Sequence, residues 1–226
     1  MEKLEFRTLR ADEIDCRVGS CNDKGCSLLM YKDARVDMRL LDEVVGPMNW
    51  KRSHELINGN LFCTVSIRDD NGEWVSKQDV GTESNTEKEK GQASDAFKRA
   101  CFNWGIGREL YSCPFVWINL RADEWRQGFN GRKQPKIRFY VSNIEYDEKR
   151  NVSYLRIVDE HGQERYVYGK SQEADKMRQE LIAKIKGAKD RHELEAIYKS
   201  ADPALKKDKA VLDACTDKAV EFKDAA

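Results

Sequence analysis

The sequence predicts an α+β protein, because strand patterns and helical patterns occur in separate runs along the chain. Residues 60–68 alternate two sets of side chains in the way that is typical of a strand. The turn sequence Asp-Asp-Asn-Gly at residues 69–72 predicts a hairpin that leads into a second strand at about residues 73–80. An amphipathic helix follows this hairpin, and the chain is helical in character from about residue 171.

A helix is predicted before the hairpin and a set of short strands well after it. In residues 34–45, four aliphatic side chains fall on one helical face, and the dipeptide Gly46-Pro47 ends the helix. Three β-like runs at residues 137–145, 152–158 and 164–168 are separated by turn sequences. They predict an additional β meander, which either packs on the first sheet or forms a sheet of its own.

The helix after the hairpin is the most clearly specified element of the chain. Thr86 and Glu89 have the spacing of a capping box at its start, and Gly105 and Gly107 end it. Six apolar residues recur with helical spacing, which predicts a single buried face. These residues are Ala93, Ala96, Phe97, Ala100, Cys101 and Trp104.

The end of the chain differs in composition from the rest. It lacks tryptophan, has few β-branched residues and is dominated by Lys, Asp, Glu and Ala. Three helices are predicted there, at residues 172–186, 190–199 and 204–222. We therefore expect two domains, a core over residues 1–170 and a helical C-terminal tail module over residues 171–226.

The charges of the chain balance overall but not locally. Lys and Arg together number 40, as do Asp and Glu, which excludes a uniformly basic coating protein. Residues 98–138 hold nine Lys or Arg and three Asp or Glu, a net charge of +6. Lys98 and Arg99 lie on the polar face of the predicted helix, where fixed cations could contact phosphates. From the pattern alone, a solvated helix face remains the simpler interpretation.

The sequence favours a cytoplasmic location without a membrane anchor. Residues 56–67 form the longest uncharged stretch, 12 residues, whereas a membrane span needs about 20. The first residues contain no apolar stretch of the kind found in a secretory signal. The seven cysteines are an odd number without a Cys-x-x-Cys motif, which favours free thiols over disulfides or a zinc site.

No catalytic constellation is apparent, and we do not expect an enzyme or a bound cofactor or metal. The three histidines have no ligand spacing, and the motifs of serine hydrolases, zinc proteases and phosphate-binding loops are missing from the sequence. An alternative is a metal-dependent nuclease that uses the carboxylates around the hairpin. Those carboxylates are Asp69, Asp70, Glu73 and Asp79.

A series of short motifs between the N-terminal region and residue 111 occurs in a recognisable order. They are Asp12-Glu13-Ile14-Asp15-Cys16-Arg17, Tyr31-Lys32-Asp33-Ala34-Arg35-Val36, Leu41-Asp42-Glu43-Val44-Val45-Gly46, Asn49-Trp50, Asp79-Val80-Gly81, Asp95-Ala96-Phe97-Lys98-Arg99-Ala100, Trp104-Gly105-Ile106-Gly107 and Leu110-Tyr111. Together they resemble the Rad-fifty-two family of single-strand annealing proteins, which includes eukaryotic recombination mediators and their phage relatives. The first motif is similar to the end of the family's N-terminal helix, which closes on an arginine.

This resemblance implies a fold, an assembly and a set of site residues. The implied fold has a β-β-β-α core, an antiparallel sheet packed on the amphipathic helix, and the implied assembly is a homo-oligomeric ring or spiral. Single-stranded DNA would lie in a positive groove around it. Arg17, Lys98 and Arg99 match the family's backbone-binding cations, and Lys90 matches a family lysine on the same helix. The run Thr82–Glu89 is poorer in lysine than the family's, so the resemblance gives no detail of a second DNA site.

The resemblance implies a function without covalent chemistry. We expect ATP-independent binding and annealing of single-stranded DNA in homologous recombination and DNA repair, of the type found in phage recombination. The expected partners are single-stranded DNA, further copies of the chain, and a single-strand-binding protein or a recombinase. The alternatives are a single-strand-binding or recombinase-loading mediator that does not anneal DNA, and the nuclease described above.

Overall fold

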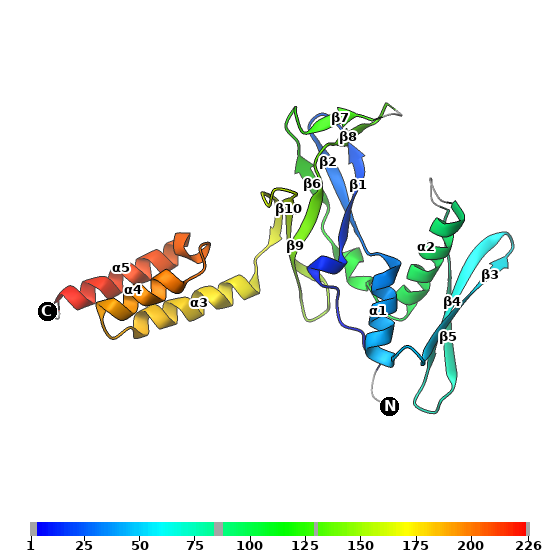
Figure 1. Ribbon diagram of the computed structural model, residues 1–226, viewed down its shortest axis with the longest axis horizontal. Coiled ribbons are helices and arrows are strands. Elements are labelled where there is room, and N and C mark those ends of the chain that lie inside the picture. The colour runs from blue at the N-terminus through cyan, green and yellow to red at the C-terminus, as the bar shows by residue number, and fades with distance from the viewer. Residues whose placement is uncertain (1–3, 84–87, 129–130, 225–226) are drawn as a thin grey trace. The chain divides into compact units, whose positions relative to one another are not determined.

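The computed structural model describes residues 4–83, 88–128 and 131–224 (Figure 1). Its chain divides into two compact units, Met1–Gly169 and Lys170–Ala226. The first unit contains a large sheet, a small sheet and two long helices, and the second contains helices only. The fold is α+β, as the sequence predicts.

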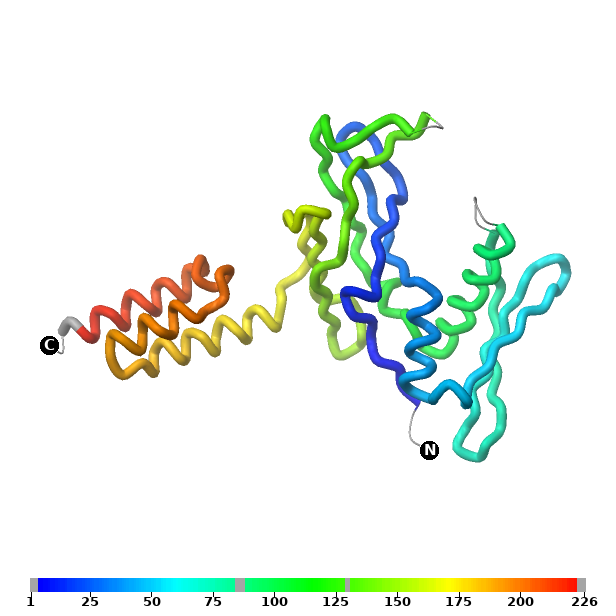
Figure 2. The backbone as a smooth tube through the Cα atoms, in the orientation of Figure 1, coloured from blue at the N-terminus to red at the C-terminus, as the bar shows by residue number. Residues whose placement is uncertain are grey.

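The large sheet of the first unit has six strands in the order β11-β10-β9-β1-β2-β6, and all its pairs are antiparallel. Its strands are β1 (Asp15–Cys21), β2 (Gly25–Tyr31), β6 (Val116–Asn119), β9 (Phe139–Tyr146), β10 (Val152–Asp159) and β11 (Glu164–Gly169). The predicted meander is β9-β10-β11, and it joins the same sheet as β1. Figure 2 shows this arrangement, with the blue β1 beside the yellow-green β9.

The N-terminal strands correct one expectation. Residues before Arg17 form only a short 3-10 helix, Ala11–Glu13, and Arg17 itself lies within the strand β1. The sequence prefers a hairpin here because the Asn22 side chain accepts hydrogen bonds from the backbone N–H groups of Lys24 and Gly25. That turn sets β1 against β2, so the expected helix ending at Arg17 is wrong.

The two edge strands of the large sheet, β11 and β6, lie next to each other. Although β11 and β6 are at opposite ends of the strand order, the Arg165 guanidinium donates to the Asn119 carbonyl at 2.9 Å. The Tyr166 hydroxyl donates to the Phe115 carbonyl at 3.2 Å. These side-chain contacts substitute for backbone pairing, so the sheet curls around an apolar interior. That interior includes Cys26, Leu28, Val116, Ile118, Phe139, Val141, Leu155 and Ile157.

The small sheet consists of β3 (Trp50–Ile57), β4 (Asn60–Arg68) and β5 (Trp74–Val80), and α2 (Lys88–Asn103) packs on it. The strands at 60–68 and at about 73–80 are therefore confirmed. The helix α1 (Ala34–Val45) precedes this sheet and has the predicted bounds. The strand β3 was not predicted, because six of its eight residues are exposed and its sequence therefore shows no apolar–polar alternation.

The predicted apolar stripe of α2 faces β4 and β5. Ala96, Phe97, Ala100 and Cys101 are fully buried, and Cys63, Val65 and Ile67 of β4 are buried opposite them. The Trp104 indole N–H donates to the Val65 carbonyl at 3.1 Å. Thr86 of the expected capping box lies outside the described residues.

Gly81 allows this close packing, because a Cβ there would lie 2.2 Å from the Gln92 carbonyl oxygen of α2. The motif Asp79-Val80-Gly81 therefore has a structural role where β5 ends.

The second unit holds α3 (Gln172–Gly187), α4 (Arg191–Ser200) and α5 (Lys209–Asp224), with a 3-10 turn at Leu205–Lys207. Ser171 and Asp190 cap the first two helices through their side chains. The helices share a core made of Leu181, Ile185, Ala188, Leu194, Val211 and Ala214. Among the described residues, none of the helices is long and apolar enough to cross a membrane.

Phe97 is the largest fully buried side chain of the α2 stripe, and its ring lies 6.2 Å from the ring of Trp50. We expect Phe97→Ala to lower the free energy of unfolding by about 3–5 kcal/mol, because it leaves a cavity in a close-packed core. Urea unfolding followed by circular dichroism measures this change. Leu56→Ala is the control, since Leu56 is exposed, and a similar loss in both variants would contradict the packing of α2.

Each unit has its own hydrophobic core. We therefore expect a chain that ends at Gly169 to fold alone, because its removed part contributes no residue to the first core. Circular dichroism and size-exclusion chromatography of residues 1–169 measure this. An unfolded or aggregated fragment would overturn the division of the chain at this point.

Candidate nucleic-acid interface

A groove of about 250 Å³ lies between the end of β2 and the C-terminal half of α2. Three cations line it, Lys32, Lys98 and Arg99, and they face one carboxylate, Asp95. The Asp95 carboxylate accepts hydrogen bonds from the Thr82 backbone N–H and hydroxyl. The groove therefore combines positive charge with open space.

Lys98 and Arg99 differ in how far their charges are already neutralised. The Lys98 ammonium forms no hydrogen bond or ion pair with any described residue. Hydrogen bonds from Arg35 are the main cause that lowers the pKa of the nearby Asp33, and the charge of Lys98 adds to this effect. The Arg99 guanidinium lies 3.3 Å from a carboxylate oxygen of Asp79, and its side chain is 46% exposed. An exposed pair of this kind contributes little free energy, so Arg99 can exchange Asp79 for a phosphate.

Arg17 and Lys90 lie outside the groove lining. Arg17 is exposed on β1, opposite Leu29 of β2. Burial raises the pKa of Tyr31, which lines the groove, and the charge of Arg17 acts in the opposite direction. Lys90 is exposed near the start of α2, eight residues from Lys98 and therefore about 12 Å along the helix axis. Of the four predicted cations, Lys98 and Arg99 line the groove, whereas Arg17 and Lys90 do not. Their role in binding stays a prediction.

Aromatic rings line the same groove, and the sequence analysis assigned them no role. Tyr111 is 75% exposed, and its ring lies 4.8 Å from that of Phe102 in a tilted pair. Tyr31 is 41% exposed on the opposite wall. Exposed rings beside cations are the surfaces on which nucleic-acid bases stack. Tyr31 and Tyr111 did appear in the family-like motifs, which was the only sequence signal for them.

A buried ion pair closes the floor of the groove. Lys32 and Asp37 are both buried and bond to each other through the Lys32 ammonium and one Asp37 oxygen. Burial raises the pKa of Asp37 to about 6, and Lys32 acts in the opposite direction. Gly107 has a φ of +76°, and a Cβ there would lie 2.3 Å from the Lys32 side chain. The Gly-Ile-Gly motif after α2 therefore makes room for Lys32.

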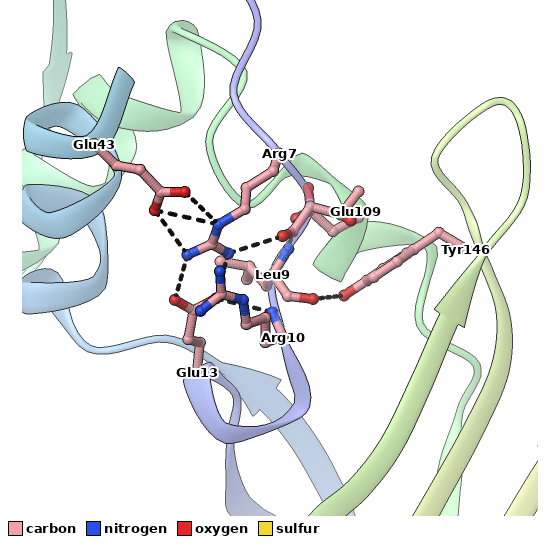
Figure 3. Close-up of polar contacts among 8 residues, drawn as sticks. Arg7, Leu9, Arg10, Glu13, Glu43, Glu109 and Tyr146 are labelled. Atoms are coloured by element: carbon pink, nitrogen blue, oxygen red, sulfur yellow. Dashed lines mark hydrogen bonds and ion pairs between the residues drawn. The ribbon is translucent and has the colours of Figure 1, made fainter. Parts of the chain in front are cut away.

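The N-terminal segment is tied to the same region by a second set of polar contacts (Figure 3). The Arg7 guanidinium bonds to Glu13 at 2.7 Å and to Glu43 of α1 at 3.1 Å, and Arg7 lowers the pKa of Glu13. The Leu9 backbone N–H donates to the buried Glu109 carboxylate at 2.8 Å. Glu109 belongs to the short helix Arg108–Ser112, which carries Tyr111. These contacts hold the wall of the groove that presents Tyr111.

Of the carboxylates around the β4–β5 hairpin, Asp69 stabilises the turn itself. The Asp69 side chain accepts hydrogen bonds from the backbone N–H groups of Asn71 and Glu73 at 2.9 and 2.8 Å. Asp79 faces Arg99 at the other end of β5. Among the residues that the structure describes, no three His, Cys, Asp or Glu side chains cluster as metal ligands would. All seven cysteines are free thiols.

The comparison with known families agrees with this geometry. Residues 1–129 match the model of the Rad52/22 family double-strand break repair protein, and this match covers more than half of the chain. The chain belongs to the Rad52/22 family. The match contains β1 to β6, α1, α2 and the groove, whereas β9 to β11 and the helical unit follow it.

Two curated relatives resemble part of the chain. The single-stranded DNA-binding protein DdrA of Deinococcus radiodurans is 36% identical over 103 residues, which cover 45% of this chain and 48% of the relative. The protein of the same name from Deinococcus deserti is 37% identical over 93 residues, covering 40% and 45%. The chain therefore spans slightly less than half the length of these relatives.

The Lys32–Asp37 pair generates a prediction about stability. We expect Asp37→Ala to lower the free energy of unfolding by about 3–5 kcal/mol, because it leaves the Lys32 ammonium buried without its partner. The double variant Lys32→Met/Asp37→Leu should recover most of this loss, since it removes both charges and keeps the volume. Urea unfolding of the three proteins measures the coupling. Equal losses in the single and double variants would show that the pair is not the cause.

Proposed function

We propose that the chain binds single-stranded DNA and anneals complementary strands without ATP, in homologous recombination and DNA repair. The observation that carries this proposal is the groove, which joins Lys98 and Arg99 of α2 to the exposed rings of Tyr31 and Tyr111. Membership of the Rad52/22 family and the single-stranded DNA-binding relatives support it.

The geometry suits binding that does not depend on base sequence. Cations neutralise phosphates and release counterions, which supplies affinity for any strand. Aromatic rings accept every base, because every base has a flat face. Lys98 and Arg99 would hold the backbone in the groove, and Arg17 and Lys90 would extend the contact along β1 and α2.

We further propose that the two parts of the chain have different functions. Residues 1–170 would bind and anneal DNA as a homo-oligomeric ring or spiral, and residues 171–226 would act as a separate helical module. A single-strand-binding protein or a recombinase would be a further partner. The protein would work in the cytoplasm, without catalysing a covalent step.

A second candidate is a binding protein or recombinase-loading mediator that does not anneal. The curated relatives favour it, because their names state single-stranded DNA binding only. The two candidates share the groove and differ in one measurable property, the rate at which two complementary strands pair.

The deciding experiment measures annealing of two labelled complementary oligonucleotides without ATP. We expect the wild-type chain to accelerate pairing and Lys98→Ala/Arg99→Ala to lose most of the acceleration. We also expect the double variant to bind more weakly and to flatten the salt dependence of binding by about 1.4 in the log–log slope, from about 0.7 per lost phosphate contact. Lys186→Ala/Lys189→Ala is the matched control, since both lysines are exposed in the helical unit.

Each outcome separates the candidates. Binding without acceleration would favour the mediator over the annealing protein. A double variant that binds and anneals like the wild type would remove Lys98 and Arg99 from the site. A wild-type chain that neither binds nor accelerates pairing would overturn both candidates.

A further inference from the structure

The exposed face of the large sheet carries a row of side chains that continues away from the groove. Asp15 of β1 pairs with Tyr31 of β2 on one side and with Tyr140 of β9 on the other. Paired residues on neighbouring strands point to the same face, so the three side chains form one row. Tyr31 lines the groove and is 41% exposed, and Tyr140 is 47% exposed. The row therefore starts at the groove and crosses three strands.

A second row, of cations, lies beside the first. Arg17 is two residues beyond Asp15, and Arg138 is two residues before Tyr140, directly preceding β9. Since β1 and β9 are antiparallel, both arginines fall on the same side of the Asp15–Tyr140 pair and on the same face. The Arg138 carbonyl still accepts from the Glu160 N–H at 3.1 Å, so its backbone continues the sheet. Two guanidinium groups are thereby brought to one exposed surface.

The segment around Arg138 has an excess of positive charge. Residues 125–144 contain five Lys or Arg and no Asp or Glu, although Asp123, Glu124 and Glu145 flank this run. Three of these cations, Arg126, Lys136 and Arg138, are exposed, and their side chains form no hydrogen bond or ion pair with any described residue. Cationic side chains that lack a carboxylate partner repel one another, and an anion that binds them removes the repulsion. The surface is therefore suited to binding a polyanion.

The hairpin before β9 holds this surface in place. It consists of β7 (Trp125–Gln127) and β8 (Lys133–Pro135) and lies at the end of the large sheet beside β1 and β2 (Figure 1). The Lys133 ammonium lies 4.2 Å from the Trp125 ring and 3.8 Å from an Asp23 oxygen. Arg165, Glu124 and Asp159 form buried ion pairs at the base of the hairpin. These contacts leave Arg126, Lys136 and Arg138 exposed to solvent.

We propose that Arg138 and Tyr140 extend the DNA contact across the sheet, Arg138 binding a phosphate and Tyr140 stacking on a base. The carboxylate of Asp15 repels phosphates, so the backbone follows the arginine row and the bases follow the tyrosine row. The two tyrosines stand on strands separated by β1, roughly 10 Å apart at 4.7–4.9 Å per strand. Arg138 and Tyr140 lie after residue 129 in the sequence, where the family match ends. This inference rests on the proposed function.

The test measures binding of a labelled oligothymidylate by fluorescence anisotropy over a series of salt concentrations. We expect Arg138→Ala to lower the log–log salt slope by about 0.7, the contribution of one phosphate on a single strand. We expect Tyr140→Ala to leave the slope unchanged and to weaken binding roughly 5-fold or more, which corresponds to about 1 kcal/mol of stacking. Tyr140→Phe keeps the ring and should bind like the wild type.

Lys149→Ala is the matched control for Arg138, because Lys149 is an exposed cation in the turn that follows β9. Its slope should equal that of the wild type, and circular dichroism should show that all four variants are folded. If the wild type binds and needs Lys98 and Arg99, but Arg138→Ala keeps its slope and Tyr140→Ala keeps its affinity, this inference is overturned and the proposed function stands. If the wild type does not bind, both fall.

Discussion

Packing of one face of α2 against the small sheet fixes the positions of the cations on its other face. Ala96 and Ala100 let the helix approach β4 closely, and Phe97 fills the space between them. Gly81 lets the end of β5 touch the helix backbone, where any side chain would collide with the Gln92 carbonyl. A helix held in this way cannot rotate without exposing its apolar stripe. Lys98 and Arg99 are therefore directed into the groove by contacts that they do not make themselves.

The chain has no net charge, yet parts of its surface are positive, because the fold distributes the exposed charges unevenly. Buried carboxylates pair with buried or half-buried cations, as in Asp37 with Lys32, Glu13 with Arg7, and Glu124 with Arg165. Each such pair removes one positive and one negative charge together, so it leaves the net charge of the surface unchanged. The cations that remain exposed without a partner, Lys98 and Arg138 among them, give a local positive field that net charge does not reveal.

The sequence predicted those elements whose burial follows a simple period. The bounds of α1 and β4 and the buried face of α2 were correct, because one side of each is apolar and the other polar. The strand β3 has no such contrast, and β1 was mistaken for the end of a helix because its hairpin depends on the Asn22 turn. Periodicity reports burial, so it does not detect a strand that is exposed on both faces.

For the candidate site too, sequence patterns identify only residues that lie close together in the chain. Lys98 and Arg99 could be singled out because they are adjacent on one helix, within a motif typical of the family. Arg138 and Tyr140 could not, because their place beside Arg17 and Tyr31 comes from pairing between strands more than 120 residues apart.

Pairing of this kind also decides what the surface can do. A single helix presents cations in one line, whereas neighbouring antiparallel strands present separate rows of rings and cations on one plane. Separate rows let a strand be held by its phosphates while its bases lie flat on rings that bind without base-specific hydrogen bonds. Bases held only by stacking keep their pairing edges free, which is the state that a complementary strand needs to find.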